Sequence, residues 1–243
     1  MINFLSTIFN TSDIFNEFPF QIKIIRIRKN SISLIIRNGI LYIRSPNILS
    51  ERQMYLVIKK KEDWIKKKID IQKERIENLN KESLRKDIFL YEGMEKKIDK
   101  INSKIYSTQI IKNKLIFSGP DLSDSNVKKR LQAWFRKVAL EKIEKKSNFF
   151  AKKMKLSFRK VGVKNYKSKW GLCMNLRKEI YINWRLVMAP KSVLNYVIIH
   201  ELCHLIEPNH SKKFWYYVEK IKPDYKMDEK WLKNKGYFLF AKL

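Results

Sequence analysis

All three histidines of this 243-residue chain lie within one stretch of eleven residues, from His200 to His210. The first two enclose a glutamate in the pattern H-E-x-x-H, with Glu201 directly after His200 and with His204 at the end. Residues four apart lie on the same face of a helix, with Cβ atoms about 5–6 Å apart. The pattern therefore requires a helix here, which would point two imidazoles at one small cation. The apolar run 196–199 would bury the other faces of this helix.

His210 is the natural third ligand, because a catalytic zinc usually takes three protein ligands and keeps a fourth position for water. Pro208 disfavours helical backbone at Glu207, so the helix should stop near Ile206 and the chain should turn back toward the metal. The histidine spacing equals that of the metzincin motif H-E-x-x-H-x-x-G-x-x-H, except that Glu207 replaces the turn glycine. Glu207 and Glu219 therefore remain alternative third ligands.

These residue types predict a zinc metallopeptidase-type hydrolase. Zn²⁺ would lower the pKa of its bound water toward about 7. Glu201 would act as general base, taking a proton from this metal-activated water during attack on a carbonyl and passing it to the leaving amine. We name Lys169, Trp170 and Asn183 as candidate substrate-binding residues, with Lys169 a candidate second donor to the oxyanion.

The motif has two other interpretations. H-E-x-x-H also occurs by chance on ordinary amphipathic helices, but a third histidine at ligand spacing, with no histidine elsewhere in the chain, favours a metal site. A structural zinc site could use Cys203 together with His200 and His204. Structural sites favour several thiolates, and the only other cysteine is Cys173, so this interpretation is the weaker one.

The composition indicates a globular chain with one large or two small domains, since 44% of the residues are hydrophobic and 13% are aromatic. Two cysteines fit a reducing compartment better than a disulfide scaffold. The amino terminus shows no basic region with a cleavage site, and no apolar run has the length of a membrane span. We therefore expect a cytoplasmic protein that does not interact with a membrane.

The formal net charge of +29 has two explanations. Lysine and arginine displace counterions from phosphates, so a strongly basic chain suggests nucleic acid as a partner. The basic residues are mostly lysines spread along the chain, however, and the lysine and isoleucine enrichment is also what an AT-rich genome produces. Both explanations stay open.

The first half of the chain predicts a β-rich domain over residues 1–120 with one long helix. Asn38-Gly39 stands between two β-branched runs and is a strong hairpin signal. Ser50 and Gln53 form a capping box that opens a helix running toward Arg75. The expected strands cover 21–28, 31–37 and 40–44, with further short strands between 88 and 118.

The second half, residues 121–243, predicts a catalytic domain of the zincin type with a small β sheet. A long amphipathic helix should be capped by Asp124 or Ser125 and end near Met154, and the metal helix should start at Pro190 or Lys191. Strands are expected at 158–163 and 179–183, with one helix after His210 and a last short one around Trp231. The fold class is therefore α+β, and no internal repeat stands out.

Several further segments surround the histidine motif: Ser168-Lys169-Trp170-Gly171, Ile182-Asn183-Trp184-Arg185-Leu186, Ala189-Pro190, Tyr196-Val197, and Asn209-His210-Ser211 with Phe214-Trp215. With them the chain resembles the YgjP family of metal-dependent hydrolases, which is related to the SprT-like and WLM zincins. The similarity covers nearly the whole chain, including the hairpin and the segment Leu90-Tyr91-Glu92-Gly93. It implies a compact α+β zincin without the turn glycine, in which His200, His204 and His210 bind Zn²⁺.

One segment departs from the family pattern S-R-W-G-S-C-S, because Leu172 and Met174 replace two serines. If those serines bind substrate in relatives, specificity has changed here; if they only shape a turn, little is lost. The leading function is hydrolysis of a peptide or protein substrate. The alternatives are a nucleotide phosphoanhydride hydrolase, for which the chain shows neither a P-loop nor an acidic Mg²⁺ cluster, and a basic nucleic-acid-associated protein with a zincin domain. The sequence does not predict the oligomeric state.

Overall fold

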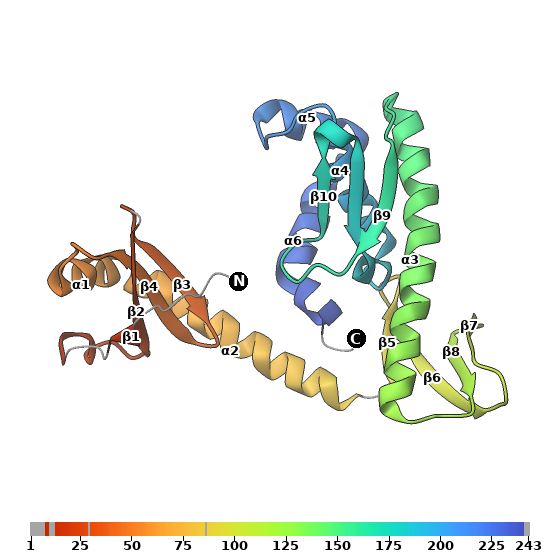
Figure 1. The fold of residues 1–243 in the computed structure, drawn as a ribbon, viewed down its shortest axis with the longest axis horizontal. Coiled ribbons are helices and arrows are strands. Elements are labelled where there is room, and N and C mark those ends of the chain that lie inside the picture. The colour runs from red at the N-terminus through yellow and green to blue at the C-terminus, as the bar shows by residue number, and fades with distance from the viewer. Residues whose placement is uncertain (1–7, 10–12, 29, 86, 241–243) are drawn as a thin grey trace. The chain divides into compact units, whose positions relative to one another are not determined.

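The computed structural model describes residues 8–9, 13–28, 30–85 and 87–240 (Figure 1). The chain divides into two compact units, Met1–Lys81 and Glu82–Leu243, each with its own hydrophobic core. Small sheets and helices are mixed in both units, which confirms the predicted α+β class. Among the residues that the structure describes, no helix is both long and apolar enough to cross a membrane.

The first unit is built on a four-stranded sheet. Its strands β2 and β4 run parallel, while β1 and β3 lie antiparallel at the two edges. The hairpin predicted at Asn38-Gly39 joins β3 to β4, and both turn residues have positive φ, 51° and 77°, as this two-residue turn requires. The strands in spatial order are β1 (Ile8–Phe9), β2 (Ile22–Ile27), β4 (Ile40–Pro46) and β3 (Ser33–Arg37).

Two helices, α1 (Glu51–Lys60) and α2 (Glu62–Leu84), stand where the sequence predicted one. The predicted capping box at Ser50 and Gln53 is present at the start of α1. The chain leaves the helical conformation at Lys61, with φ −117° and ψ 12°. Both helices nevertheless contribute to one core, in which Met54, Ile58, Ile65 and Ile69 lie with the sheet residues Ile24, Leu41 and Ile43.

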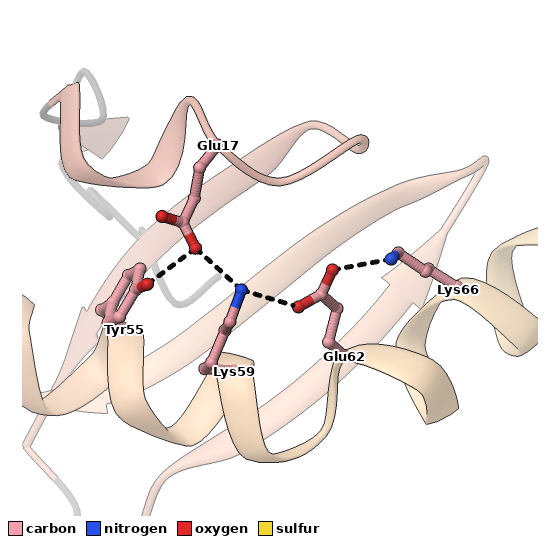
Figure 2. Close-up of polar contacts among 5 residues, drawn as sticks. All are labelled: Glu17, Tyr55, Lys59, Glu62 and Lys66. Atoms are coloured by element: carbon pink, nitrogen blue, oxygen red, sulfur yellow. Dashed lines mark hydrogen bonds and ion pairs between the residues drawn. The ribbon is translucent and has the colours of Figure 1, made fainter.

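An exposed polar network connects the two helices across this break (Figure 2). The Glu17 carboxylate accepts hydrogen bonds from the Tyr55 hydroxyl at 2.7 Å and from Lys59 at 3.1 Å. Lys59, in α1, also pairs with Glu62 in α2 at 3.3 Å, and Glu62 pairs with Lys66 at 2.7 Å. Exposed ion pairs stabilise a fold only slightly, so the buried side chains dominate the stability of this unit.

The second unit begins with a sheet that repeats the topology of the first. In both sheets the central strands run parallel and each edge strand is antiparallel to its neighbour, and a helix follows directly, α1 in one case and α3 (Asp124–Met154) in the other. The sequence did not predict a repeat. The two sheets share the directions in which their strands pair, but the amino-acid sequences of the strands are not alike. The strands in spatial order are β5 (Ile88–Tyr91), β6 (Met94–Asn102), β8 (Lys114–Gly119) and β7 (Ser107–Ile111).

A three-stranded sheet and three helices complete the second unit, with α3 running alongside (Figure 1). The long helix was predicted from Asp124 or Ser125 as its cap, but Ser123 is the N-cap residue and makes no side-chain capping bond. The remaining elements are the strands β10 (Gly171–Met174), β11 (Glu179–Asn183) and β9 (Lys160–Lys164), and the helices α4 (Lys191–Cys203), α5 (Lys212–Ile221) and α6 (Tyr225–Lys235).

The division between the units lies at Lys81/Glu82, whereas the sequence suggested residues 120/121. Strands β5 to β8 belong with the second unit because Phe117 of β8 and Phe135 of α3 lie in one hydrophobic core. The β5–β6 turn is also held there, since the backbone N–H groups of Glu92 and Gly93 donate to carbonyls 187 and 188 at 2.9 Å. The change of pattern near Gly119 therefore marks a strand-to-helix connection and no domain boundary.

Candidate metal centre

Helix α4 carries the H-E-x-x-H pattern and is buried on most of its surface. Val197, Ile198, Ile199 and Leu202 are at most 4% exposed, so these apolar faces pack into the core. The helix starts at Lys191, as predicted, and ends at Cys203, three residues before the predicted end. A tighter turn continues to Ile206, whose N–H donates to the carbonyl of Cys203 at 3.0 Å.

The chain after this turn brings the third histidine to the first two. One ligand atom from each of His200, His204 and His210 lies within 4.8 Å of the others. The Nε2 atoms of His210 and His200 are 3.0 Å apart. The Nδ1 of His204 lies 3.2 Å from the carbonyl oxygen of Glu207, which leaves its Nε2 for a metal. A backbone carbonyl on the second nitrogen is the usual way in which a metal-binding imidazole is oriented.

Neither alternative third ligand joins this group. Within the described ranges the cluster contains only the three histidines, and the carboxylates of Glu207 and Glu219 are not part of it. Glu207 acts through its main-chain carbonyl instead. The thiol of Cys203 is fully buried, and burial raises its pKa to about 12, so the protonated sulfur is a poor metal ligand.

The electrostatics of the imidazoles suit a metal. Burial, together with the charges of His204 and His210, lowers the pKa of His200 to about 3. Burial also lowers the pKa of His204. Neutral rings keep a lone pair for coordination, and neighbouring imidazole nitrogens repel one another unless a cation or a proton lies between them. The donor set therefore fits a divalent ion such as Zn²⁺.

Phe214 of α5 lies against all three imidazoles. Its ring centroid is 4.9 Å from that of His200, 4.5 Å from that of His204 and 4.7 Å from that of His210, and its side chain is fully buried. Trp215 stacks on His210 at 5.8 Å. The Nδ1 of His200 is buried without a hydrogen-bond partner in the described part of the chain. The orientation of His200 therefore depends on these ring contacts.

Glu201 is 6% exposed and lies beside the histidines on α4. Burial raises the pKa of its carboxyl to about 8, opposed by a hydrogen bond from the Cys173 backbone and by the charge of Lys169. Gly171, the first residue of β10, makes room for it, because a Cβ on that glycine would lie 2.3 Å from the Glu201 Oε1. The strand and the helix can approach this closely only without a side chain at residue 171.

A hollow of about 460 Å³ opens beside His200 and Glu201. Two of the predicted substrate-binding residues, Lys169 and Trp170, line this hollow. Trp170 is held in place by the ring of Phe240, with centroids 5.3 Å apart. The other lining residues are Gly171, Tyr196, Val197, Glu229, Leu232 and Lys233.

Asn183 does not face the hollow. Its side chain is fully buried, and its Nδ2 donates to the carbonyl of Tyr166 at 2.9 Å and to that of Lys169 at 3.2 Å. Its Oδ1 accepts the backbone N–H of Arg185 at 3.2 Å. Asn183 therefore fixes the loop that carries Lys169 and Trp170, while contact between its side chain and a substrate stays a prediction.

Tyr196 and the α6 residues of the hollow were missed in the sequence. Tyr196 precedes His200 by four residues, so helix geometry places both on one face of α4, and this signal was available. Glu229, Leu232 and Lys233 come from a helix that carries no motif. Only the folded chain brings them to the histidines.

The comparisons with known proteins agree with the motifs. The family model described as YgjP-like, metallopeptidase domain, matches residues 30–235, which include Glu201 and all three histidines. No curated protein and no solved structure matched the chain. The name of the family suggests a metal-dependent hydrolase. Because the match covers most of both units, the chain belongs to the YgjP-like metallopeptidase-domain family.

Proposed function

We propose that this chain is a zinc-dependent peptidase of the zincin type, with His200, His204 and His210 as metal ligands and Glu201 as general base. The observation that carries the proposal is the grouping of three imidazole nitrogens within 4.8 Å beside a buried carboxylate. The family assignment supports hydrolysis with a metal ion. The open hollow next to both groups supplies space for a substrate.

A zinc ion held by the three imidazoles would supply a Lewis acid that activates water and polarises the scissile carbonyl. Glu201 takes the proton of the attacking water at its carboxylate and returns it to the leaving amine. A carboxyl pKa shifted toward neutrality by burial favours both transfers, because the group can then gain and lose a proton near pH 7. The charge of Lys169 favours the ionised form that accepts the proton.

The walls of the hollow support the proposal of a peptide substrate. Trp170 and Leu232 offer apolar surface to a substrate side chain. Lys169 stands at the same hollow with its ammonium 5.5 Å from the ring centroid of Tyr166. A cation there can donate a hydrogen bond to a substrate oxygen.

The decisive experiment compares wild type with Glu201→Gln on a peptide library while the metal content is measured. We expect about one zinc per chain in both proteins, and loss of hydrolysis in the variant because an amide cannot accept the proton. Glu219→Gln is the matched control, since Glu219 is exposed on α5, lies outside the histidine cluster and does not line the hollow, so this variant should keep hydrolysis. A wild type without zinc, or an active Glu201→Gln variant, would refute the proposal. A nucleotide panel in the same assay tests phosphoanhydride hydrolysis.

A further inference from the structure

A second hollow, of about 480 Å³, lies between α3, the β5–β6 turn and the start of α4. Asn195 lines it from α4, five residues before His200, so the two side chains leave the helix about 140° apart. This hollow therefore opens on a different face of α4 from the metal centre. Its other lining residues are Glu92, Lys142, Lys145, Lys146, Phe149, Phe150 and Lys191.

Positive charge exceeds negative charge around this hollow, because four lysines line it with a single glutamate. Glu92 pairs with Lys142 and, at 3.0 Å, with Lys191. Lys145 and Lys146 have no carboxylate partner among the described residues. Burial lowers the pKa of Lys146, and the charges of Lys142 and Lys191 lower it further. An anionic ligand would relieve this repulsion.

An exposed aromatic ring adjoins these two lysines. Phe149 is 63% exposed, so its ring is accessible to a ligand. Phe150 is 9% exposed, and its ring holds Phe149 edge-to-face with centroids 5.1 Å apart. A supported, open ring next to free ammonium groups offers a surface on which an unpaired base can stack while its phosphate meets a lysine.

The same face of α3 continues beyond the hollow. The positions of these residues follow the spacing of one helix face, so we call them the α3 stripe: Lys142, Lys145, Lys146, Phe149, Lys152 and Lys153. The stripe extends over about 16 Å of helix. It is therefore long enough to contact more than one nucleotide.

Asn195 adds a group that can read a base. Its side-chain Oδ1 is buried in the wall of the hollow and has no hydrogen-bond partner within the described part of the chain. A buried amide without a partner is unfavourable, and a ligand with hydrogen-bonding edges would satisfy it. The Asn195 Oδ1 needs a hydrogen-bond donor, which the edge of a base can supply. Inorganic phosphate at neutral pH has only its own hydroxyl to donate.

We propose that the α3 stripe and its hollow bind single-stranded nucleic acid, with a base stacked on Phe149 and phosphates contacted by Lys145 and Lys146. A single strand fits better than a duplex because the bases of a duplex are already stacked and do not expose their faces. This site is separate from the proposed peptidase centre and does not depend on its activity.

The test measures binding of a fluorescent oligothymidylate to the full chain by anisotropy at several salt concentrations. Phe149→Ala should weaken binding about ten-fold, whereas Phe149→Trp, which keeps an aromatic ring, should bind with an affinity close to that of the wild type. The double variant Lys145→Gln, Lys146→Gln should lower the slope of log K against log salt by about 1.4. The double variant Lys128→Gln, Lys129→Gln removes equal charge from the other end of α3 and should change neither quantity appreciably.

Three results would overturn the proposal. The first is that both double variants weaken binding equally, which would show that charge alone attracts the strand. The second is unchanged binding by Phe149→Ala, with thermal unfolding confirming that the variant is folded. The third is displacement of the oligothymidylate by thymidine monophosphate or by a duplex at equal nucleotide concentration, which would assign the hollow to another ligand.

Discussion

Gly171→Ala should strongly slow the proposed hydrolysis while leaving the metal ligands in place. The substitution adds one methyl group at the first residue of β10, where the strand passes over Glu201. The added Cβ would lie 2.3 Å from the Glu201 Oε1 and 2.6 Å from the Cγ and Cδ. These atoms belong to a flexible side chain, so the carboxylate should move while the backbone stays.

The geometry gives the size of the effect. Ordinary van der Waals contact with a Cβ begins at 3.4 Å, so the carboxylate oxygen must withdraw by about 1 Å. Misplacing a reacting group by about 1 Å lowers the rate roughly 100-fold, which corresponds to about 2.7 kcal/mol of transition-state stabilisation. The three atoms nearest to the added Cβ all belong to the Glu201 side chain, so the histidines should keep their positions and zinc binding should remain.

The assay compares kcat/KM on a cleaved library peptide with zinc content and thermal unfolding of each protein. Gly162→Ala is the matched control, because Gly162 lies in β9 of the same sheet and its added Cβ would meet only the Tyr181 ring, at 3.3 Å. We expect near-normal activity in that control. The Glu201→Gln variant gives the reference value for the activity that remains without the proposed general base.

Two outcomes would refute this reasoning. Activity of Gly171→Ala within a few-fold of wild type would mean that the position of the Glu201 carboxylate does not limit hydrolysis. Loss of zinc from Gly171→Ala would mean that the Glu201 side chain does not yield to the added methyl group. Helix α4 would then move away from the strand and take its histidines with it. Either result would separate the role of Gly171 from that of Glu201.

Three further predictions concern the second unit. Asp228→Asn should destabilise the protein by about 3 kcal/mol in urea unfolding, because Lys222, at 11% exposure, loses its most buried carboxylate partner; a loss below about 1 kcal/mol would contradict this. Burial raises the pKa of Glu92, but hydrogen bonds and charge from its two lysine partners outweigh that effect and hold it below 4.5. Its ionised form therefore stabilises the fold above pH 4.5 and is lost as the pH falls through the lower folded-state pKa, so Glu92→Gln should unfold more easily than wild type at pH 7 and the difference should vanish in acid. Chelation of the metal should lower the thermal midpoint, and zinc but not magnesium should restore it, since only the folded chain presents the three imidazoles together; an unchanged midpoint after verified metal removal would speak against a ligand set that couples to folding.

The parts of the structure that the sequence predicted best depend on neighbouring residues. The hairpin at Asn38-Gly39 needs two residues with positive φ, and the capping box at Ser50 needs only Gln53 three residues later. The grouping of His200 and His204 follows from the period of one helix. His210 is six residues further on, and a single turn brings it back. Local rules are sufficient for each of these features.

The missed features depend on contacts between segments far apart in the chain. Gly171 looks like one residue of a Trp-Gly motif until Glu201, thirty residues later, is placed above it. Asn183 was predicted to bind substrate because it lies in a motif, yet its three hydrogen bonds all hold backbone groups. The domain boundary was misplaced for the same reason, since only packing shows that Phe117 and Phe135 share a core.

The structure can show whether basic residues form a binding site or only reflect the overall composition of the chain. The chain has 53 lysines and arginines, and their number alone cannot distinguish nucleic-acid binding from genome composition. The positions of the lysines add information that their number lacks. Lys59 and Lys66 have carboxylate partners, whereas Lys145 and Lys146 line a hollow beside an exposed ring. Removing two charges from the α3 stripe and two from elsewhere on the same helix changes the net charge equally. A difference in affinity between those two variants can therefore arise only from where the lysines stand.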